Sequence, residues 1–428
     1  MNKEIIAVFE KIGYDGVSIG KYNKKKVFAW GILPGEKAKI RITKKRRNFI
    51  QGELLEVLEK SSHRKKELEA HYLSCSPWQT FDYNYQIELK KNLLQEIYLK
   101  FAKTEIQLEN FFPSQKKFGY RTKIEYSFME ENEKQFFAFY KRENFREKIK
   151  LIDGCKLMSE HANRIAYTVL EEINKQKIKD LKTLIIRKSQ RYKDMHVSLL
   201  TWNRNQKFNF ENKGLSGFSF VYSRKESPAS TFDEILQERG LQYLREKILE
   251  LEVKYHYTSF FQNNIELFEK ALQIMRENSQ TFEKIVDLYA GVGVIGLALA
   301  DFGKEILSIE IDKTATEYAE ANAESNDIKN FRAVNLASEK IPLEILEKTD
   351  LLILDPPRSG LHKKVIKLIL KTKPKNIFYL SCNPVTQARD FSFLKEKYNA
   401  KKFYGFDFYP NTPHIEAFLH LQLKAKSL

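Results

Sequence analysis

The sequence predicts a multidomain chain with an N-terminal OB-like β-barrel, a central α+β domain and a C-terminal α/β domain built on a doubly wound parallel sheet. Three observations predict this class. Residues 1–60 contain short alternating apolar runs, residues 61–255 mix a helical stretch with strand-like runs, and residues 256–428 alternate strands with helices. The length of 428 residues is enough for several domains, so we predict boundaries near residues 60 and 255.

The first 60 residues predict a small barrel. The runs KVFAWGIL, AKIRIT and FIQGELLEVL are separated by the turn signals GYDG, YNKKK and LPGE. A cluster of basic residues without an acidic one occupies a strand and its following turn: Lys37, Lys39, Arg41, Lys44, Lys45, Arg46 and Arg47. OB-like domains bind nucleic acid with such a surface, whereas the alternative is a solvated hairpin tip.

The central part predicts one long helix followed by strands. YQIELKKNLLQEIYLKF has helical spacing within residues 81–103, and this helix could pack on the C-terminal domain. The later runs KIEYSFM, FFAFY, TLIIRK and HVSLLTW read as strands. In the last part the segments KIVDLY, EILSIEI, DLLILD and NIFYLS read as strands separated by helices, the rhythm of a parallel sheet.

The net charge of +17 predicts a polyanionic partner. Residues 1–60 carry +7, residues 61–255 carry +9 and residues 256–428 carry only +1. No apolar run is long enough for a membrane span and the N-terminus lacks the apolar core of a signal peptide, so we expect no membrane contact and a cytoplasmic location. Nucleic acid is then favoured over anionic lipid, and a basic surface without a partner is the alternative.

A glycine-rich motif marks a ligand site. Gly291, Gly293 and Gly296 follow the strand KIVDLY and open a helix, and Glu310 ends the next strand. Glycines let a backbone approach a ligand closely, and an acid at that place accepts hydrogen bonds from ribose hydroxyls. NAD and S-adenosylmethionine both fit this pattern.

Two further loops follow predicted strands and should face the same crevice. They are Asp355-Pro356-Pro357-Arg358 after LLIL and Ser381-Cys382-Asn383-Pro384 after IFYL. A cysteine on an exposed loop beside an arginine and helix N-termini is placed as a thiolate nucleophile. The alternative is a small buried residue without a chemical role.

These motifs in this order carry a resemblance to a known family. DLYAGVGVIGLALA, SIEID, DLLILDPPRSG, YLSCNPVTQARD and TPHIEAFLHL resemble the S-adenosylmethionine-dependent RNA uracil-C5 methyltransferases, which make 5-methyluridine in 23S ribosomal RNA and transfer RNA. The N-terminal strands resemble the TRAM domain of that family, an RNA-binding barrel. The resemblance implies a Rossmann-like methyltransferase domain over residues 256–428. The aromatic and basic residues of the central domain, including Arg121 in YRTK, suit a surface for RNA, and a solvated basic face is the alternative.

The resemblance also implies roles for individual residues. Cys382 would add to C6 of uracil, and Glu416 in HIE would remove the C5 proton after methyl transfer. We expect the apolar neighbours of Glu416 to raise its pKa. S-adenosyl-L-methionine would be bound by residues at matching positions: Gln262, Tyr289, Gly291, Gly293, Glu310, Asn335 and Asp355. Val294 departs from the family, which often has Asn there.

Some family members bind a [4Fe–4S] cluster through four cysteines. Cys75 and Cys155 resemble two of these ligands, but the other positions fall on Glu69 and Trp78, so the sequence predicts no metal and no iron–sulfur cluster. We expect a monomer with ribosomal RNA favoured over transfer RNA as substrate. Rival hypotheses are an amino-methyltransferase, which needs neither Cys382 nor Glu416, and a non-catalytic RNA-binding factor.

Overall fold

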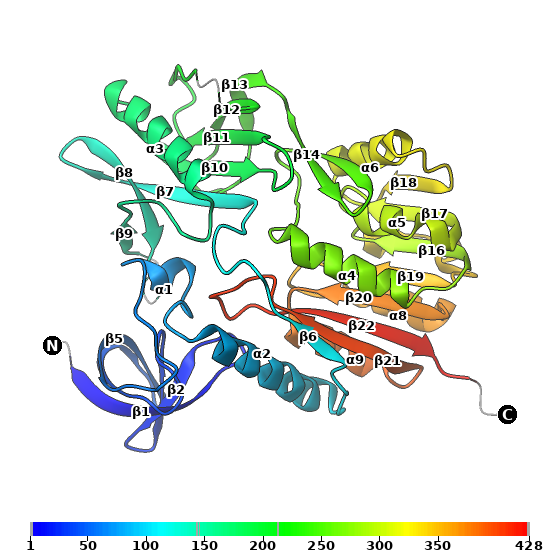
Figure 1. Cartoon of the computed structure of the whole chain (residues 1–428), viewed down its shortest axis with the longest axis horizontal. Helices are drawn as coiled ribbons and strands as arrows, with labels where there is room; N and C mark the ends of the chain where they lie inside the picture. Colours follow the sequence, from blue (N-terminus) through cyan, green and yellow to red (C-terminus); the bar gives the residue numbers. More distant parts are fainter. Residues whose placement is uncertain (1–2, 143, 145, 212–213, 426–428) are drawn as a thin grey trace.

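A computed structural model describes residues 3–142, 144, 146–211 and 214–425. The chain forms three lobes, with the barrel and the central domain on one side and the C-terminal domain on the other (Figure 1). Five strands close the barrel in the order β1-β2-β3-β5-β4. They are β1 (Glu4–Ile12), β2 (Ser18–Tyr22), β3 (Lys25–Ala29), β4 (Lys37–Lys45) and β5 (Phe49–Glu59). The predicted OB-like barrel is confirmed.

A linker joins the barrel to a long helix that packs on the C-terminal domain. The short α1 (Tyr72–Cys75) is followed by α2 (Tyr83–Ile97), which Asp82 caps by accepting hydrogen bonds from the first turn, and by a π-helical turn, η1 (Tyr98–Ala102). Residues of α2 and η1 share a core with helix α9 (Pro384–Leu394) and strand β21 (Tyr398–Phe406). The fully buried ion pair Lys90–Asp407, with 2.5 Å between Nζ and Oδ1, fixes α2 there.

The central domain is a seven-stranded sheet with one long helix. The strand order is β13-β12-β11-β10-β7-β8-β9. The bounds are β7 (Lys123–Glu131), β8 (Lys134–Tyr140), β9 (Lys148–Lys150), α3 (Glu160–Lys175), β10 (Leu181–Lys188), β11 (Met195–Thr201), β12 (Gly217–Tyr222) and β13 (Glu234–Gly240). The apolar face of α3 packs on this sheet, which agrees with the predicted α+β class.

The C-terminal domain is an eight-stranded sheet in the order β18-β17-β16-β19-β20-β22-β21-β6. Its strands are β6 (Asn110–Phe112), β16 (Phe282–Leu288), β17 (Gly303–Glu310), β18 (Phe331–Asn335), β19 (Leu351–Leu354), β20 (Asn376–Ser381), β21 and β22 (Glu416–Leu423). Strands β16 to β20 pair in parallel and β22 is antiparallel to both neighbours. The predicted α/β class is confirmed.

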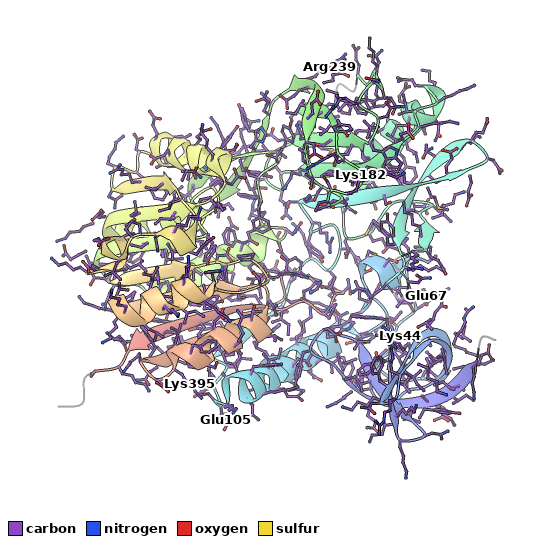
Figure 2. All side chains as sticks on the ribbon, turned by 180° about the vertical axis from the view of Figure 1, so that it is seen from behind. Lys44, Glu67, Glu105, Lys182, Arg239 and Lys395 are labelled. Carbon is purple, nitrogen blue, oxygen red and sulfur yellow. The ribbon has the colours of Figure 1, made fainter. Side chains whose placement is uncertain are left out.

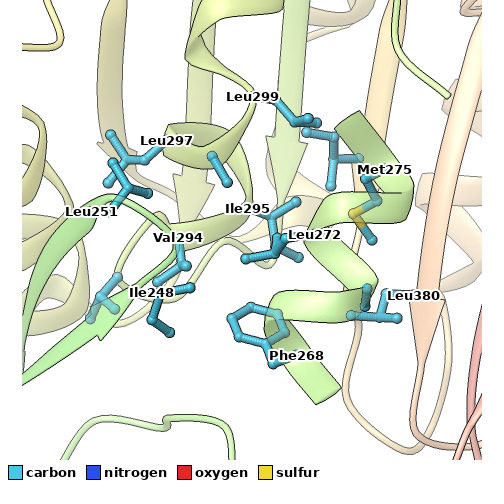
Figure 3. Close-up of a cluster of buried hydrophobic side chains, with 14 of the residues drawn as sticks. Ile248, Leu251, Phe268, Leu272, Met275, Val294, Ile295, Leu297, Leu299 and Leu380 are labelled. Atoms are coloured by element: carbon cyan, nitrogen blue, oxygen red, sulfur yellow. The ribbon is translucent and has the colours of Figure 1, made fainter. Parts of the chain in front are cut away.

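Helices cover both faces of this sheet because its strands are apolar on both faces. On one face α4 (Ile265–Glu277), α5 (Val294–Ala298) and α6 (Lys313–Ser325) pack on alternate strand residues such as Ile285. Figure 3 shows this core, where Phe268 and Leu272 of α4 lie near Ile295 of α5. On the other face α2, α8 (Lys363–Thr372) and α9 pack on the intervening residues such as Val286.

The predicted boundary at residue 255 is wrong. It falls inside β15 (Leu251–His256), which pairs with β14 (Tyr243–Ile248) in a separate hairpin. Buried residues of this hairpin, including Ile248 and Leu251, belong to the core of the C-terminal domain and not to that of the central sheet (Figure 3). Together with β6 and α2, the hairpin shows that the C-terminal domain recruits segments that precede its parallel strands in the sequence. No helix among the described residues is long and apolar enough to cross a bilayer.

Candidate active site

A cavity of about 670 Å³ opens at the carboxyl ends of β16, β17, β19 and β20. The chain runs from β16 to β17 on one side and later returns to β19 on the other side, so the loops after β16 and β19 diverge there. Such a switch point is where open α/β sheets bind ligands. Predicted site residues that line the cavity are Gln262, Tyr289, Gly291, Glu310, Asp355, Cys382 and Glu416.

The glycine-rich loop turns sharply from β16 into α5. Tyr289, Gly291 and Gly293 all have positive φ, at 62°, 55° and 82°. A Cβ added to Gly291 would meet nothing within 4 Å, whereas one on Gly293 would lie 2.9 Å from the Phe331 ring. Gly291 therefore leaves backbone open toward the cavity, and Gly293 allows the loop to pack on β18.

Glu310 fastens this loop to the end of β17. Its Oε2 accepts a hydrogen bond of 2.8 Å from the Gly291 N–H, and its Oε1 accepts one of 2.9 Å from the Asp312 N–H. Each carboxylate oxygen can accept a further bond. Glu310 can thus hold the loop and still accept hydrogen bonds from the hydroxyls of a ribose in the cavity.

Asp287 lies under the glycine-rich loop and was not predicted as a functional residue. It is fully buried, and its Oδ2 accepts a hydrogen bond of 3.1 Å from the Gly296 N–H. Burial raises the pKa of Asp287 to about 8. The carboxyl therefore keeps its proton at neutral pH in the folded protein.

Asp287→Asn should make the folded protein less sensitive to pH. The folded state retains a proton that the unfolded state releases near pH 4, so wild-type stability falls between about pH 4 and pH 8, by about 1.4 kcal/mol per pH unit from this group. An amide can keep the bond to Gly296 and does not titrate. Denaturant unfolding of the wild type and of Asp287→Asn at pH 5 and pH 7 measures the free energy of unfolding of each protein. The stability of the variant relative to the wild type should increase from pH 5 to pH 7. The exposed Asp327→Asn is the control, and equal shifts in both variants would contradict the role of burial.

Strand register brings Cys382 and Glu416 together. Strands β20 and β22 are antiparallel, and Ser381 pairs with Ala417. The next position along this ladder sets Cys382 opposite Glu416. Both side chains line the cavity, although they lie far apart in the sequence.

Burial and charge control the protonation of these groups. The pKa of Glu416 is raised well above its ordinary value, mainly by burial and further by Asp355, which agrees with the expectation from its apolar neighbours. Burial also raises the pKa of Asp355 to about 7. Gln262 donates a hydrogen bond of 3.4 Å from Nε2 to Asp355 Oδ2. A carboxyl with a pKa near 7, as in Asp355, can accept and return protons during a reaction.

The prediction that the surroundings of Cys382 stabilise its thiolate is wrong for the ligand-free protein. Cys382 is half-buried, and burial together with the charges of Glu416 and Asp355 raises its pKa to about 12, against the opposing effect of Arg358. Desolvation and two carboxyls outweigh one guanidinium.

The loop that carries Cys382 is fixed to the loop that carries Asp355. Asn383 caps α9 by accepting a hydrogen bond of 3.2 Å from the Val385 N–H, and its Nδ2 donates one of 2.8 Å to the Arg358 carbonyl. Behind Cys382, the buried Gln387 donates from Nε2 to the carbonyls of Tyr379 and Ala417. These bonds hold the strand ends that present Cys382 and Glu416.

Comparison with known proteins identifies the family. A family model described as tRNA (Uracil-5-)-methyltransferase matches residues 82–424, and a TRAM-domain model matches residues 2–55. The chain belongs to the tRNA (uracil-5-)-methyltransferase family. It is therefore an RNA methyltransferase that uses S-adenosyl-L-methionine, which confirms the predicted enzyme class, cofactor and TRAM domain.

Relatives of this methyltransferase match along nearly their whole length. An uncharacterized RNA methyltransferase of Nanoarchaeum equitans is 31% identical, over 94% of this chain and 90% of its own. One from Caldanaerobacter subterraneus is 28% identical, over 96% and 97%. The crystal structure of a tRNA (uracil-54, C5)-methyltransferase from Pyrococcus abyssi, in complex with S-adenosyl-L-homocysteine, has the same fold, with a TM-score of 0.76 and 24% identity over 97% of this chain and all of that one.

Two predicted cofactor residues of the methyltransferase do not line the cavity among the described residues, namely Gly293 and Asn335. The Asn335 amide donates to the backbone carbonyls of Glu310 and Ile311, at 3.1 and 2.9 Å. Its side chain thus positions the end of β17. Gly293 allows the glycine-rich loop to pack against Phe331 of β18.

Sequence reasoning missed two exposed apolar side chains in the methyltransferase cavity. Phe260 is 65% exposed and Ile311 is 68% exposed, and both line the cavity. Large apolar side chains left open in a concave site are typical of surfaces that planar ligands cover. Ile311 directly follows Glu310 in the sequence, and this position was the one signal from which its place in the cavity could have been predicted.

The predicted RNA-binding residues of the methyltransferase form two groups on the barrel, and Arg121 lies apart from both. Lys37, Lys39 and Arg41 form ion pairs with Glu59, Glu4 and Glu53 on neighbouring barrel strands. Lys44, Lys45, Arg46 and Arg47 are exposed and form no ion pair within the described ranges, and Figure 2 labels Lys44 on the barrel. Arg121 is half-buried beside Tyr120 and Cys155. All eight RNA contacts stay predictions.

Proposed function

We propose that this enzyme methylates C5 of a uridine in RNA through a covalent bond between Cys382 and C6 of the base. The observation that carries the proposal is the antiparallel pairing of β20 with β22, which sets Cys382 and Glu416 beside each other in a cavity that the glycine-rich loop and Glu310 also line. A nucleophile, a base and a cofactor pocket thus share one space. An amino-methyltransferase would need neither of the two paired residues.

S-adenosyl-L-methionine would supply the methyl group from its sulfonium, and breaking of the bond between sulfur and methyl would leave the thioether S-adenosyl-L-homocysteine. Glu310 would hold its ribose, the open backbone at Gly291 would lie against it, and the apolar Ile311 would cover its adenine. Gln262 and Asp355 stand between this pocket and Cys382, where they would orient the reacting base.

Cys382 and Glu416 would act in sequence on the base. Cys382 gives its proton to a nearby carboxylate and adds to C6, and the electron pair of the C5–C6 double bond becomes an enolate through C4, so that C5 can accept the methyl group. Glu416 then removes the proton from C5. The C5–C6 double bond forms again as the bond between sulfur and C6 breaks, which returns the thiolate.

Product analysis tests the proposed reaction. Transcribed 23S ribosomal RNA and total transfer RNA are incubated with the protein and labelled S-adenosyl-L-methionine, digested to nucleosides and examined by mass spectrometry. We expect label in 5-methyluridine. Label in methylated adenosine would favour the amino-methyltransferase, and absence of transfer would favour the non-catalytic factor.

A mapping experiment identifies the target RNA. The sequence-based expectation is ribosomal RNA, whereas the Pyrococcus abyssi neighbour acts on uracil 54 of transfer RNA. Exposed cations on the barrel match the phosphate backbone of either RNA. Mapping 5-methyluridine in both RNAs from a deletion strain, with and without the restored gene, identifies the position that depends on this enzyme.

Removal of the exposed cations should weaken RNA binding. The change of Lys44, Lys45, Arg46 and Arg47 to Ala removes up to four phosphate contacts, so the slope of log affinity against log salt should fall by up to about 3 and affinity by tenfold or more at low salt. Filter binding over a salt series measures both.

A control with the same loss of charge comes from the C-terminal domain. Lys348, Lys367, Lys371 and Lys373 are exposed and do not line the cavity, so their change to Ala should leave the salt slope nearly unchanged. Equal effects of the two quadruple variants would show that only net charge matters and that the barrel has no specific share in binding.

A further inference from the structure

A cluster of four metal-ligating side chains lies outside the catalytic cavity. Glu69, His71 and Cys75 belong to the linker after the barrel, and Cys155 belongs to a loop of the central domain. One donor atom from each residue lies within 4.8 Å of all the others. His71 and Cys155 are buried, and the Glu69 side chain is 6% exposed.

The donors of this cluster face one another. His71 Nε2 lies 3.2 Å from Glu69 Oε1, its partner in a buried ion pair. The Cys75 thiol contacts Glu69 Oε2 and the His71 carbonyl at 3.8 Å, the Tyr72 carbonyl at 3.9 Å and its neighbour Ser76. Imidazole, carboxylate and thiol groups that face one another in a buried space can all bind the same cation.

Other groups already orient the Glu69 carboxylate. Its Oε1 accepts a hydrogen bond of 2.6 Å from the Lys156 N–H, and its Oε2 accepts one of 2.9 Å from Gln79 Nε2. Each oxygen keeps capacity for a second partner. Outer hydrogen bonds of this kind commonly fix the carboxylate ligands of metal sites.

The cluster does not fit a [4Fe–4S] centre. Such a cluster takes four thiolates, but only Cys75 and Cys155 are here, and the remaining cysteine of the chain, Cys382, lines the catalytic cavity. Trp78, at the fourth position that the family resemblance implies, stacks on Phe81 and donates from its indole to the Gly16 carbonyl.

The donor set fits a single zinc ion. Zn²⁺ takes thiolate, imidazole and carboxylate ligands at about 2.0–2.3 Å in a tetrahedron, so the ligand atoms of one ion lie about 3.3–3.8 Å apart. The donor atoms of this cluster lie within 4.8 Å of one another, so binding would draw them together by up to about 1 Å. Two thiolates, one carboxylate and Zn²⁺ leave a net charge of −1, and the Arg121 guanidinium lies close enough to both sulfur atoms to interact with them electrostatically.

We propose that Glu69, His71, Cys75 and Cys155 bind one Zn²⁺ ion that ties the linker to the central domain. The linker is already fastened to the barrel, because Arg64 forms an ion pair of 2.6 Å with the buried Glu36. A closed four-ligand site on its other side would fix the RNA-binding barrel relative to the central domain. Four protein ligands without an open position are typical of a structural zinc site.

Metal analysis of untagged protein tests this site. After reduction and incubation with Zn²⁺ followed by desalting, we expect about one zinc per chain by mass spectrometry. Co²⁺ in its place should give the visible bands of a tetrahedral site and a thiolate charge-transfer band. Cys75→Ser, Cys155→Ser and His71→Asn should each lower zinc by at least tenfold, whereas Cys382→Ser is the matched control and should retain it.

Three results would overturn the zinc site. They are less than about 0.2 zinc per chain in reconstituted wild type, unchanged zinc in Cys75→Ser/Cys155→Ser, and about four iron atoms with four sulfides per chain. Because a ligand variant could fail to fold, thiol modification of wild type gives a second measurement. Zinc should leave in step with the modification of Cys75 and Cys155 mapped by peptide mass, and zinc retained after both are modified would contradict coordination by sulfur.

Discussion

Cys382→Ser should abolish methyl transfer and the covalent bond to RNA. RNA that contains 5-fluorouridine traps the wild-type enzyme, because fluorine at C5 cannot be removed as a proton and the bond between sulfur and C6 persists. A hydroxyl is a far weaker nucleophile than a thiolate, so turnover should fall by roughly 10⁴-fold or more. Denaturing gels with labelled cofactor detect the adduct, and nucleoside analysis measures turnover.

The folded state of the Cys382→Ser variant is checked by cofactor binding. Cys382 follows β20, and β16 and β19 lie between β20 and the strand β17 that carries Glu310, so calorimetric affinity for S-adenosyl-L-methionine should change by less than about threefold. The covalent mechanism would be contradicted if the adduct still formed in Cys382→Ser, or if the wild type formed no adduct. Either result would leave the family assignment intact.

Glu416→Gln should separate methyl transfer from product release. Gln has nearly the same shape but cannot accept the C5 proton, so turnover should drop by roughly 10²–10⁴-fold. The variant can still add through Cys382 and accept the methyl group, and methylated RNA should therefore accumulate in covalent linkage to the enzyme. Denaturing gels with ordinary RNA and a cofactor labelled in its methyl group reveal this species.

A second glutamate of the same cavity is the control for Glu416. Glu339 also lines the cavity, and Glu339→Gln should leave turnover within a few-fold of wild type. Normal turnover in Glu416→Gln would remove it as the base. Loss of both turnover and methylated adduct would instead assign Glu416 to an earlier step, such as accepting the thiol proton.

Local patterns in the sequence were sufficient for the parts of the site that depend on nearby residues. The glycine-rich loop, Glu310 and the loops at Asp355 and Cys382 each follow a strand, and parallel strands bring their carboxyl ends to one edge. Family resemblance was needed to predict the role of Glu416. Its position beside Cys382 depends on the antiparallel pairing of β22 with β20, which no local pattern in the sequence indicates.

Contacts between distant segments corrected several expectations. The boundary at residue 255 failed because the composition of a hairpin does not reveal which core it joins. Three of the barrel cations form ion pairs with glutamates on neighbouring strands, which the sequence shows only as separate charges. The pKa of Cys382 rises because burial and two carboxyls come from elements that the sequence keeps far apart.

The sequence by itself thus determined three domains of known class, a cofactor loop and a candidate nucleophile, because alternation, turn residues and strand-end motifs are local properties of the chain. Only the tertiary structure decided the protonation of Cys382 and Glu416, the ion pairs of the barrel and the meeting of Glu69 and His71 with two thiols. Desolvation, Coulomb interaction and metal coordination all depend on distances between residues that folding alone brings together.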